Sequence, residues 1–124
     1  MASNGADRDA LAFGTRIQDL RRQAGLTQRQ VAEKLGIDFT YLSKVENSRG
    51  APPGEDTIRR MAQLFSSDPD ELLALAGKVP AELRERAVED RQFARFLRTL
   101  PLLPDDVLQK LYRDAGTSPK RGRQ

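Results

Sequence analysis

The sequence predicts an all-α protein, in which a five-helix domain is followed by a short helical extension. Three observations predict this fold. Apolar residues recur at intervals of three and four along most of the chain, which gathers them on one face of a helix. Glycine, proline and capping residues interrupt that pattern at short intervals, so the helices should be short. No stretch shows the alternation of apolar and polar residues that marks a half-buried strand.

The first two helices are predicted between Phe13 and Gly36. Apolar residues at helical spacing begin at Phe13 and stop at Gly25, and the polar residues 1–12 before them predict a disordered arm. Thr27 and Gln30 have the spacing of a capping box, in which each side chain bonds the backbone amide of the other residue. A second, very short helix should therefore begin at this box and end at Gly36.

The third helix should begin at Asp38, a residue type that caps helix N-termini. Its Leu42 and Val45 fall on one face, whereas its polar side chains fall on others. The segment "RGAPPG" then breaks the chain. "EDTIRRMAQLF" and "DPDELLALAG" restart it as a fourth and a fifth helix, which completes a domain over residues 13–76.

Residues 77–116 form the predicted extension, with three helices in "KVPAELRERAVED", "RQFARFLRTL" and "PLLPDDVLQKLYRDAG". These helices carry more apolar residues than so short a segment can bury alone, so they should pack on a neighbour. A second copy of the chain is the expected neighbour, with Phe93, Phe96 and Leu97 at the centre of the contact. The alternative is that the extension folds back onto its own domain. The basic tail 117–124 should be disordered.

The composition excludes several classes of site. The chain of 124 residues has no cysteine and no histidine, which removes thiolate nucleophiles, imidazole bases and most zinc sites. We therefore expect no metal and no cofactor, and an enzyme would depend on carboxylates, serine, lysine or tyrosine. No apolar run approaches the roughly 20 residues of a membrane span, so we expect a soluble, cytoplasmic protein without a membrane partner.

Charge is distributed unevenly along the predicted domain. Residues 13–50 carry seven Arg or Lys against four Asp or Glu, a net charge of +3. Residues 51–76 carry two against five, a net charge of −3. A domain with this distribution presents one end to a polyanion. The simpler alternative is a solvated surface whose charge happens to be uneven.

Three motifs, "GLTQ", "VAEKLGI" and "YLSKVEN", follow one another between Gly25 and Asn47, and two more apolar helices follow them. Together they resemble the helix-turn-helix of the Cro/lambda-repressor-like family, often called XRE, over about residues 13–76. The resemblance implies that the helix beginning at Asp38 lies in the major groove of double-stranded DNA. It also implies that the preceding helix lies across the phosphate backbone. The loop "SRGAPPG" departs from the smallest phage repressors because it is longer.

The expected DNA contacts form two groups. Base edges should be contacted by Phe39, Thr40, Ser43 and Lys44. Phosphates should be contacted by Thr27, Gln28, Asn47 and Arg49. For four positions a structural alternative stays open. Gln28 would be an ordinary exposed glutamine, and Phe39 would cover the edge of the core. Asn47 would cap its helix, and Asp38 would cap its helix instead of accepting a bond from cytosine. The resemblance further implies a structural ion pair between Arg21 and Glu46.

The resulting functional hypothesis is a dimeric, sequence-specific transcriptional repressor in the bacterial cytoplasm, located at the nucleoid when bound to DNA. One alternative is a DNA-binding antitoxin whose extension binds a toxin. The resemblance also makes a regulatory protease a candidate partner. A weaker alternative is a carboxylate-dependent nuclease that uses Asp105 and Asp106, although adjacent acids after a proline are typical of the first turn of a helix.

Overall fold

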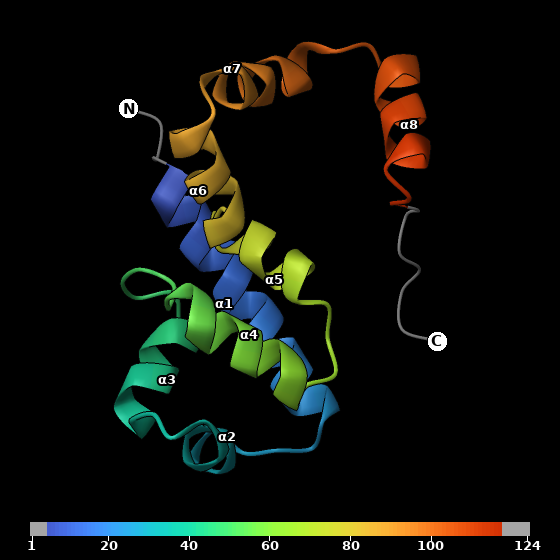
Figure 1. Cartoon of the computed structure of the whole chain (residues 1–124). Helices are drawn as coiled ribbons and strands as arrows, with labels where there is room; N and C mark the ends of the chain where they lie inside the picture. The colour runs from blue at the N-terminus through green and yellow to red at the C-terminus, as the bar shows by residue number, and fades with distance from the viewer. Residues whose placement is uncertain (1–4, 118–124) are drawn as a thin grey trace. The chain divides into compact units, whose positions relative to one another are not determined.

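The computed structural model describes residues 5–117, and all of the regular structure in this range is helical (Figure 1). The chain divides into two compact units, with the boundary between Pro80 and Ala81. The first unit contains α1 (Gly5–Gln23), α2 (Gln28–Leu35), α3 (Phe39–Glu46), α4 (Glu55–Leu64) and α5 (Pro69–Leu75). The second contains α6 (Ala81–Glu89), α7 (Arg91–Thr99), the 3₁₀ turn η1 (Leu100–Leu102) and α8 (Asp105–Asp114). The all-α fold is confirmed.

The first unit has its own apolar core. Helix α1 packs against α3 and α5, α4 packs against α5, and α2 packs against α3 and α4 (Figure 1). The side chains that these contacts bury all come from this unit: Phe13, Ile17, Leu20, Val31, Ala32, Leu35, Leu42, Val45, Ile58, Met61, Ala62, Leu72, Leu73 and Ala76. Because every member of this cluster lies between residues 13 and 76, the first unit can bury its apolar surface without the second.

The short helices of the first unit begin and end at the residues that the sequence indicates. The capping box is present, since the Gln30 amide donates to Thr27 Oγ1 at 3.1 Å and the Thr27 amide donates to Gln30 Oε1 at 2.8 Å. Gly36 then ends α2 with a left-handed φ of 68°, which a residue without Cβ adopts at no steric cost. Asp38 accepts a hydrogen bond from the Tyr41 amide and so caps α3.

Helix α1 begins at Gly5 instead of Phe13, so the prediction of a disordered arm over residues 1–12 is wrong for residues 5–12. The segment "ADRDALA" has no apolar period, but it consists largely of helix formers and its acids lie near the helix N-terminus. Extending a helix that Phe13 already anchors requires no new nucleus. Residues 1–4 and 118–124, with most of the predicted basic tail, lie outside the described residues.

Helices α1 and α3 approach each other closely at Gly14, which is buried. A Cβ at this position would overlap the carbonyl oxygen of Val45 and approach Ser48 Oγ to 2.9 Å. We expect Gly14→Ala to lower the free energy of unfolding by about 1–3 kcal/mol, because the helices must move apart to admit the methyl group. Urea unfolding measures the loss, and Gly54→Ala, where a Cβ meets nothing within 4 Å, is the control. Equal losses in both variants would contradict this account of the α1–α3 contact.

The second unit is a chain of short helices without a buried core. Helix α7 packs against α6 and η1, and Asp90 caps α7 by accepting a hydrogen bond from the Phe93 amide at 3.1 Å. That bond, helped by the guanidinium of Arg86, holds the pKa of Asp90 below its ordinary value, so the cap stays charged at neutral pH. No residue from 81 to 117 is buried in this unit. Among residues 5–117, no helix is long and apolar enough to cross a bilayer.

Candidate nucleic-acid interface

The start of α2 offers hydrogen-bond donors to an anion. The capping box occupies the amides of Thr27 and Gln30, whereas the amides of Gln28 and Arg29 have no partner among the described residues. Unpaired amides at a helix N-terminus carry partial positive charge and suit a phosphate oxygen. They border an open hollow lined by Arg21, Gly25, Leu26, Thr27, Gln28, Arg29 and Phe39. This arrangement is what a phosphate contact across α2 requires.

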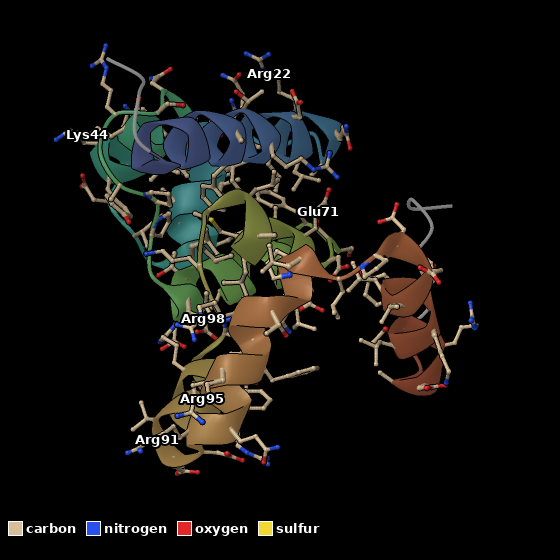
Figure 2. All side chains as sticks on the ribbon, turned by 90° about the horizontal axis from the view of Figure 1, so that it is seen from above. Arg22, Lys44, Glu71, Arg91, Arg95 and Arg98 are labelled. Atoms are coloured by element: carbon tan, nitrogen blue, oxygen red, sulfur yellow. The ribbon has the colours of Figure 1, made fainter. Side chains whose placement is uncertain are left out.

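The exposed face of α3 carries most of the residues expected to contact bases. Leu42, Val45 and Glu46 are buried and fix which side of the helix faces the core. On the opposite side, Thr40, Ser43 and Lys44 fall within an arc of roughly 100° at 100° per residue. Thr40 and Lys44 are exposed and Ser43 is half-buried. Lys44 points away from the helices of the first unit (Figure 2). These three side chains therefore share one accessible face.

Phe39 lies on the flank of this face and is not part of the buried core. It is 36% exposed, and the guanidinium carbon of Arg29 lies 4.5 Å from the centroid of its ring. Sequence reasoning did not single out Arg29. The stacking joins the first turn of α2 to the first turn of α3, so it orients the phenyl ring and places a positive charge beside it. The alternative in which Phe39 covers the edge of the core is therefore not observed.

Tyr41 of α3 is a second residue, after Arg29 of α2, that sequence reasoning did not single out. Its side chain is on the other flank of the exposed face and is 39% exposed. Partial burial raises the pKa of its hydroxyl above the ordinary value, so the group stays protonated around neutral pH and can donate a hydrogen bond. The sequence offered one signal, since Tyr41 lies in the helix predicted to face DNA and a tyrosine hydroxyl is among the groups that donate to phosphates.

Arg21 and Glu46 form a bidentate ion pair inside the first unit. Arg21 Nε donates to Glu46 Oε2 at 2.7 Å, and Arg21 Nη2 donates to Glu46 Oε1 at 3.0 Å. The carboxylate is fully shielded from solvent and the guanidinium nearly so, with side-chain exposures of 0% and 12%. Arg21 Nη1 also donates to the Leu26 carbonyl at 3.0 Å. The pair thus ties α1 and the turn before α2 to the end of α3.

Gln28 belongs to this same network, which changes its expected role. Its side-chain amide donates to Glu46 Oε1 at 2.9 Å, so Gln28 is not the free surface donor that sequence reasoning assumed. A glutamine amide nitrogen has two N–H groups, so one still remains for a phosphate oxygen. The phosphate contact of Gln28 stays a prediction, and replacing Gln28 would also remove a hydrogen bond from a buried carboxylate.

The two phosphate-contacting candidates after α3 differ in their surroundings. Asn47 is the C-cap of α3, which is the structural role expected as the alternative to a phosphate contact. Its side-chain amide donates to Ser43 Oγ at 3.4 Å. Its side chain nevertheless remains exposed beside the face of α3. Arg49 is exposed and has no side-chain partner among the described residues. Both side chains therefore stay accessible to a ligand on the α3 side of the unit.

The carboxylates considered for a nuclease do not form a site. Asp105 and Asp106 lie in the first turn of α8, where negative charge stabilises a helix. Within residues 5–117, no group of three acidic side chains is arranged to hold a metal ion. Among the described residues, the α2–α3 surface is where most of the predicted site residues lie together.

Comparison with known proteins shows the family of this domain. A family model described as a helix-turn-helix domain matches residues 12–75, which is more than half of the chain. The chain belongs to the helix-turn-helix domain family. The matched residues contain α2, α3 and the Arg21–Glu46 ion pair, so this part of the chain is an XRE-like DNA-binding domain.

Several relatives share this helix-turn-helix domain. The uncharacterized HTH-type transcriptional regulator RghRB of Bacillus subtilis (strain 168) is 36% identical over 76 residues, which is 59% of this chain and 55% of RghRB. The HTH-type transcriptional repressor RghR of the same organism is 26% identical over 111 residues, covering 83% of this chain and 82% of RghR. The chain spans about half the length of RghRB.

A solved structure also aligns with this part of the chain. It is the restriction-modification controller protein C.AhdI from Aeromonas hydrophila, with 31% sequence identity and a TM-score of 0.48. The alignment covers 52% of this chain and 96% of C.AhdI.

Proposed function

We propose that this protein is a sequence-specific transcriptional regulator that binds a near-palindromic operator as a homodimer and represses transcription. The observation that carries the proposal is the exposed face of α3, with Thr40, Ser43 and Lys44 on one side of a helix whose other side is fixed in the core. The major groove admits one α-helix, and side chains on its free face can reach base edges. The amides at the start of α2 supply the accompanying phosphate contact.

Each side chain on this face has a chemical role in the proposal. Lys44 donates to guanine O6 or N7, and Thr40 offers its methyl group to thymine and its hydroxyl to a base edge. The Ser43 hydroxyl can either donate a hydrogen bond to the facing base edge or accept one from it. Phe39, held by Arg29 at 4.5 Å, contacts a thymine methyl at the edge of the face. The phosphate backbone of the DNA is contacted on either side by Arg49, by Asn47 and by the N-terminus of α2. These contacts fix the position of α3 along the groove.

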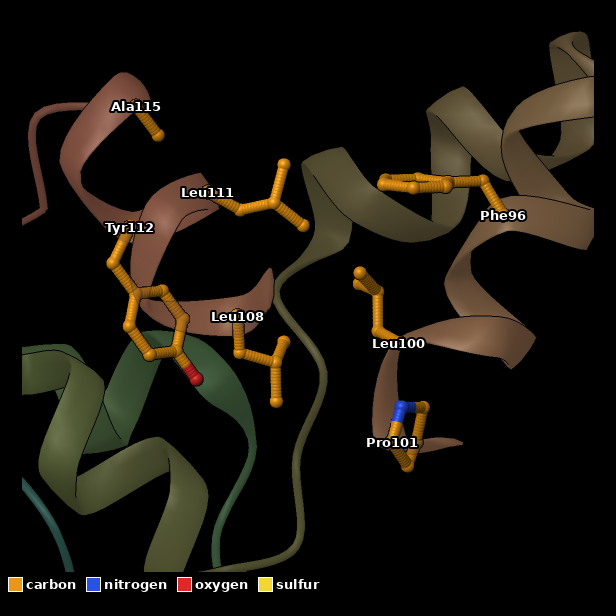
Figure 3. A pocket seen from close by; sticks show the side chains of 7 residues that line it. All are labelled: Phe96, Leu100, Pro101, Leu108, Leu111, Tyr112 and Ala115. Carbon is orange, nitrogen blue, oxygen red and sulfur yellow. The ribbon is translucent and has the colours of Figure 1, made fainter. Parts of the chain in front are cut away.

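The dimer is proposed from the unburied apolar residues of the second unit. Phe96 is 45% exposed, while Phe93 and Leu97 are half-buried, and the Phe93 ring lies 5.3 Å from the guanidinium carbon of Arg86. Beside Phe96, a hollow of about 480 Å³ is lined by apolar side chains of α7, η1 and α8, as Figure 3 shows. Exposed apolar surfaces of this kind can mark protein–protein contacts, and a second copy of the chain would cover this one.

Repression is the proposed outcome because a protein that occupies a promoter blocks polymerase without needing an activating surface. RghR, which aligns with 83% of this chain, is itself named a transcriptional repressor. The second candidate function is a DNA-binding antitoxin, and the observation that favours it is the same apolar surface, which could cover a toxin instead of a second copy. A regulatory protease is a further candidate partner.

Base reading by Lys44 is tested on a duplex that the wild-type chain selects from a random pool. We expect Lys44→Ala to weaken binding to this duplex by about 1–3 kcal/mol and to change binding to random duplexes much less, because a base contact adds only to the matched site. Fluorescence anisotropy at one fixed salt concentration measures both affinities. Lys34→Ala, which removes an equal charge from the exposed side of α2, is the control. Equal losses on both duplexes would mean that Lys44 contacts only phosphate.

A further inference from the structure

Helix α7 carries two opposite faces of different chemistry. At roughly 100° per residue, Phe93, Phe96, Leu97 and Leu100 fall within an arc of roughly 100°, and this is the apolar side used in the proposed dimer. Arg91, Arg95 and Arg98 fall within an arc of roughly 60° whose centre lies nearly opposite. Figure 2 shows the three arginines following one another along α7. We call this set the α7 arginine row.

The α7 arginine row has no carboxylate partner. All three residues are exposed, none lies within 4.0 Å of an acid among the described residues, and α7 itself contains no acid. Two other basic residues of the second unit differ: Arg86 pairs with Asp90 at 3.4 Å, and Lys110 pairs with Asp114 at 2.9 Å, each four positions along the chain. Three guanidinium groups are thus left free on one side of a single helix.

The stability of α7 explains only one of these arginines. Arg98 lies in the last turn, where positive charge stabilises the helix, whereas Arg91 is the first residue, where positive charge opposes the helix dipole. Arg95 is four residues from Arg91 and three from Arg98, and like charges at these spacings repel each other. This repulsion costs the isolated helix some stability, which an external anion would offset.

We propose that the α7 arginine row binds the phosphate backbone of the same DNA duplex that α2 and α3 contact. This inference rests on the proposed DNA-binding function. If the apolar face of α7 packs against a second copy, the arginine row on its opposite side remains accessible in the dimer. Guanidinium groups bind phosphate oxygens in a forked geometry, and successive groups along one helix face can follow a strand of phosphates. The row adds affinity without sequence preference, since phosphates carry no sequence information.

The salt dependence of binding tests the proposal, because each phosphate contact releases counterions. The test variant is R95Q/R98Q in the full chain, and the matched control is K110Q/R113Q, which removes the same charge from exposed positions of α8 in the same unit. Binding to a random-sequence duplex several turns long is measured over a series of KCl concentrations. We expect R95Q/R98Q to lower the slope of log K against log salt by about two and to weaken binding at 0.1 M KCl roughly tenfold or more. We expect K110Q/R113Q to leave the slope at the wild-type value.

Several results would overturn the proposal. An unchanged slope in R95Q/R98Q, with wild-type protein that binds DNA, contradicts the arginine contact and leaves the proposed function standing. Equal changes in the two variants indicate an effect of net charge alone. A wild-type chain that binds no DNA removes the proposed function together with this inference. Circular dichroism and sedimentation of both variants complete the test: an R95Q/R98Q variant that loses its oligomeric state places the row in a protein contact. Loss of binding to anionic phosphatidylglycerol vesicles, with DNA binding intact, assigns the row to a lipid surface instead.

Discussion

Replacing Glu46 by alanine should lower the free energy of unfolding of the first unit by about 3–5 kcal/mol, because it strands a buried guanidinium. Glu46 accepts hydrogen bonds from Arg21 at 2.7 and 3.0 Å and from Gln28 at 2.9 Å, and its side chain is fully shielded from solvent. Removing it leaves Arg21, which is 12% exposed, with only the Leu26 carbonyl as a partner. Urea unfolding followed by circular dichroism measures the change.

The double variant Arg21→Ala with Glu46→Ala separates the pair from its individual members. We expect it to lose less stability than the sum of the two single variants, because the second substitution removes a charge that the first has already left unpaired. Lys110→Ala is the control, since Lys110 pairs with Asp114 at 2.9 Å on the exposed surface of α8 and such exposed pairs contribute little. Strict additivity of the Arg21 and Glu46 substitutions would show that the buried pair does not couple the helices.

Cutting the chain after Gly77 should convert a dimer into a folded monomer and weaken binding to a palindromic site by roughly 10²–10⁴-fold. The truncated chain keeps its fold because every buried apolar side chain of the core cluster lies between residues 13 and 76. It loses affinity because two unlinked domains must each give up their freedom of motion to occupy the two half-sites. Analytical ultracentrifugation gives the oligomeric state, and titration of a palindromic duplex gives the affinity.

A single substitution in the full chain makes the same test without truncation. Phe96→Glu should dissociate the dimer while leaving the helices intact, since Phe96 is 45% exposed within its own unit. Ala94→Glu, at an exposed position on the flank of the same helix, should leave the dimer intact. A truncated chain that stays dimeric would move the interface into residues 13–76. A full chain that is monomeric at micromolar concentration would leave the second unit free for a toxin or another partner.

The fold could be predicted from the sequence because its determinants are local. Apolar spacing located the helices, and the capping box at Thr27 and the left-handed Gly36 fixed the ends of α2. The start of α1 could not be predicted in this way. Its first residues have no apolar period, and they are helical because they extend a helix that is anchored further along the chain.

The candidate site was only partly predictable, since several of its contacts join residues that are distant in the sequence. Gln28 bonds Glu46 across 18 positions, and Arg29 stacks on Phe39 across the turn. Helical spacing could place Thr40 and Lys44 on one face, but it could not show which α2 side chains the end of α3 would engage. The resemblance supplied the pairing of Arg21 with Glu46, which the structure brings to 2.7 Å.

Sequence reading by α3 and joint binding by two copies of the chain can be tested in one experiment. Duplexes are selected from a random pool by the full-length chain and then sequenced. We expect enrichment of a near-palindrome whose half-sites lie about 10 base pairs, or a multiple of that spacing, apart centre to centre. A pool that shows no enriched motif after selection, from a chain that binds DNA, would contradict sequence reading by α3. Enrichment of an isolated half-site would contradict the dimer.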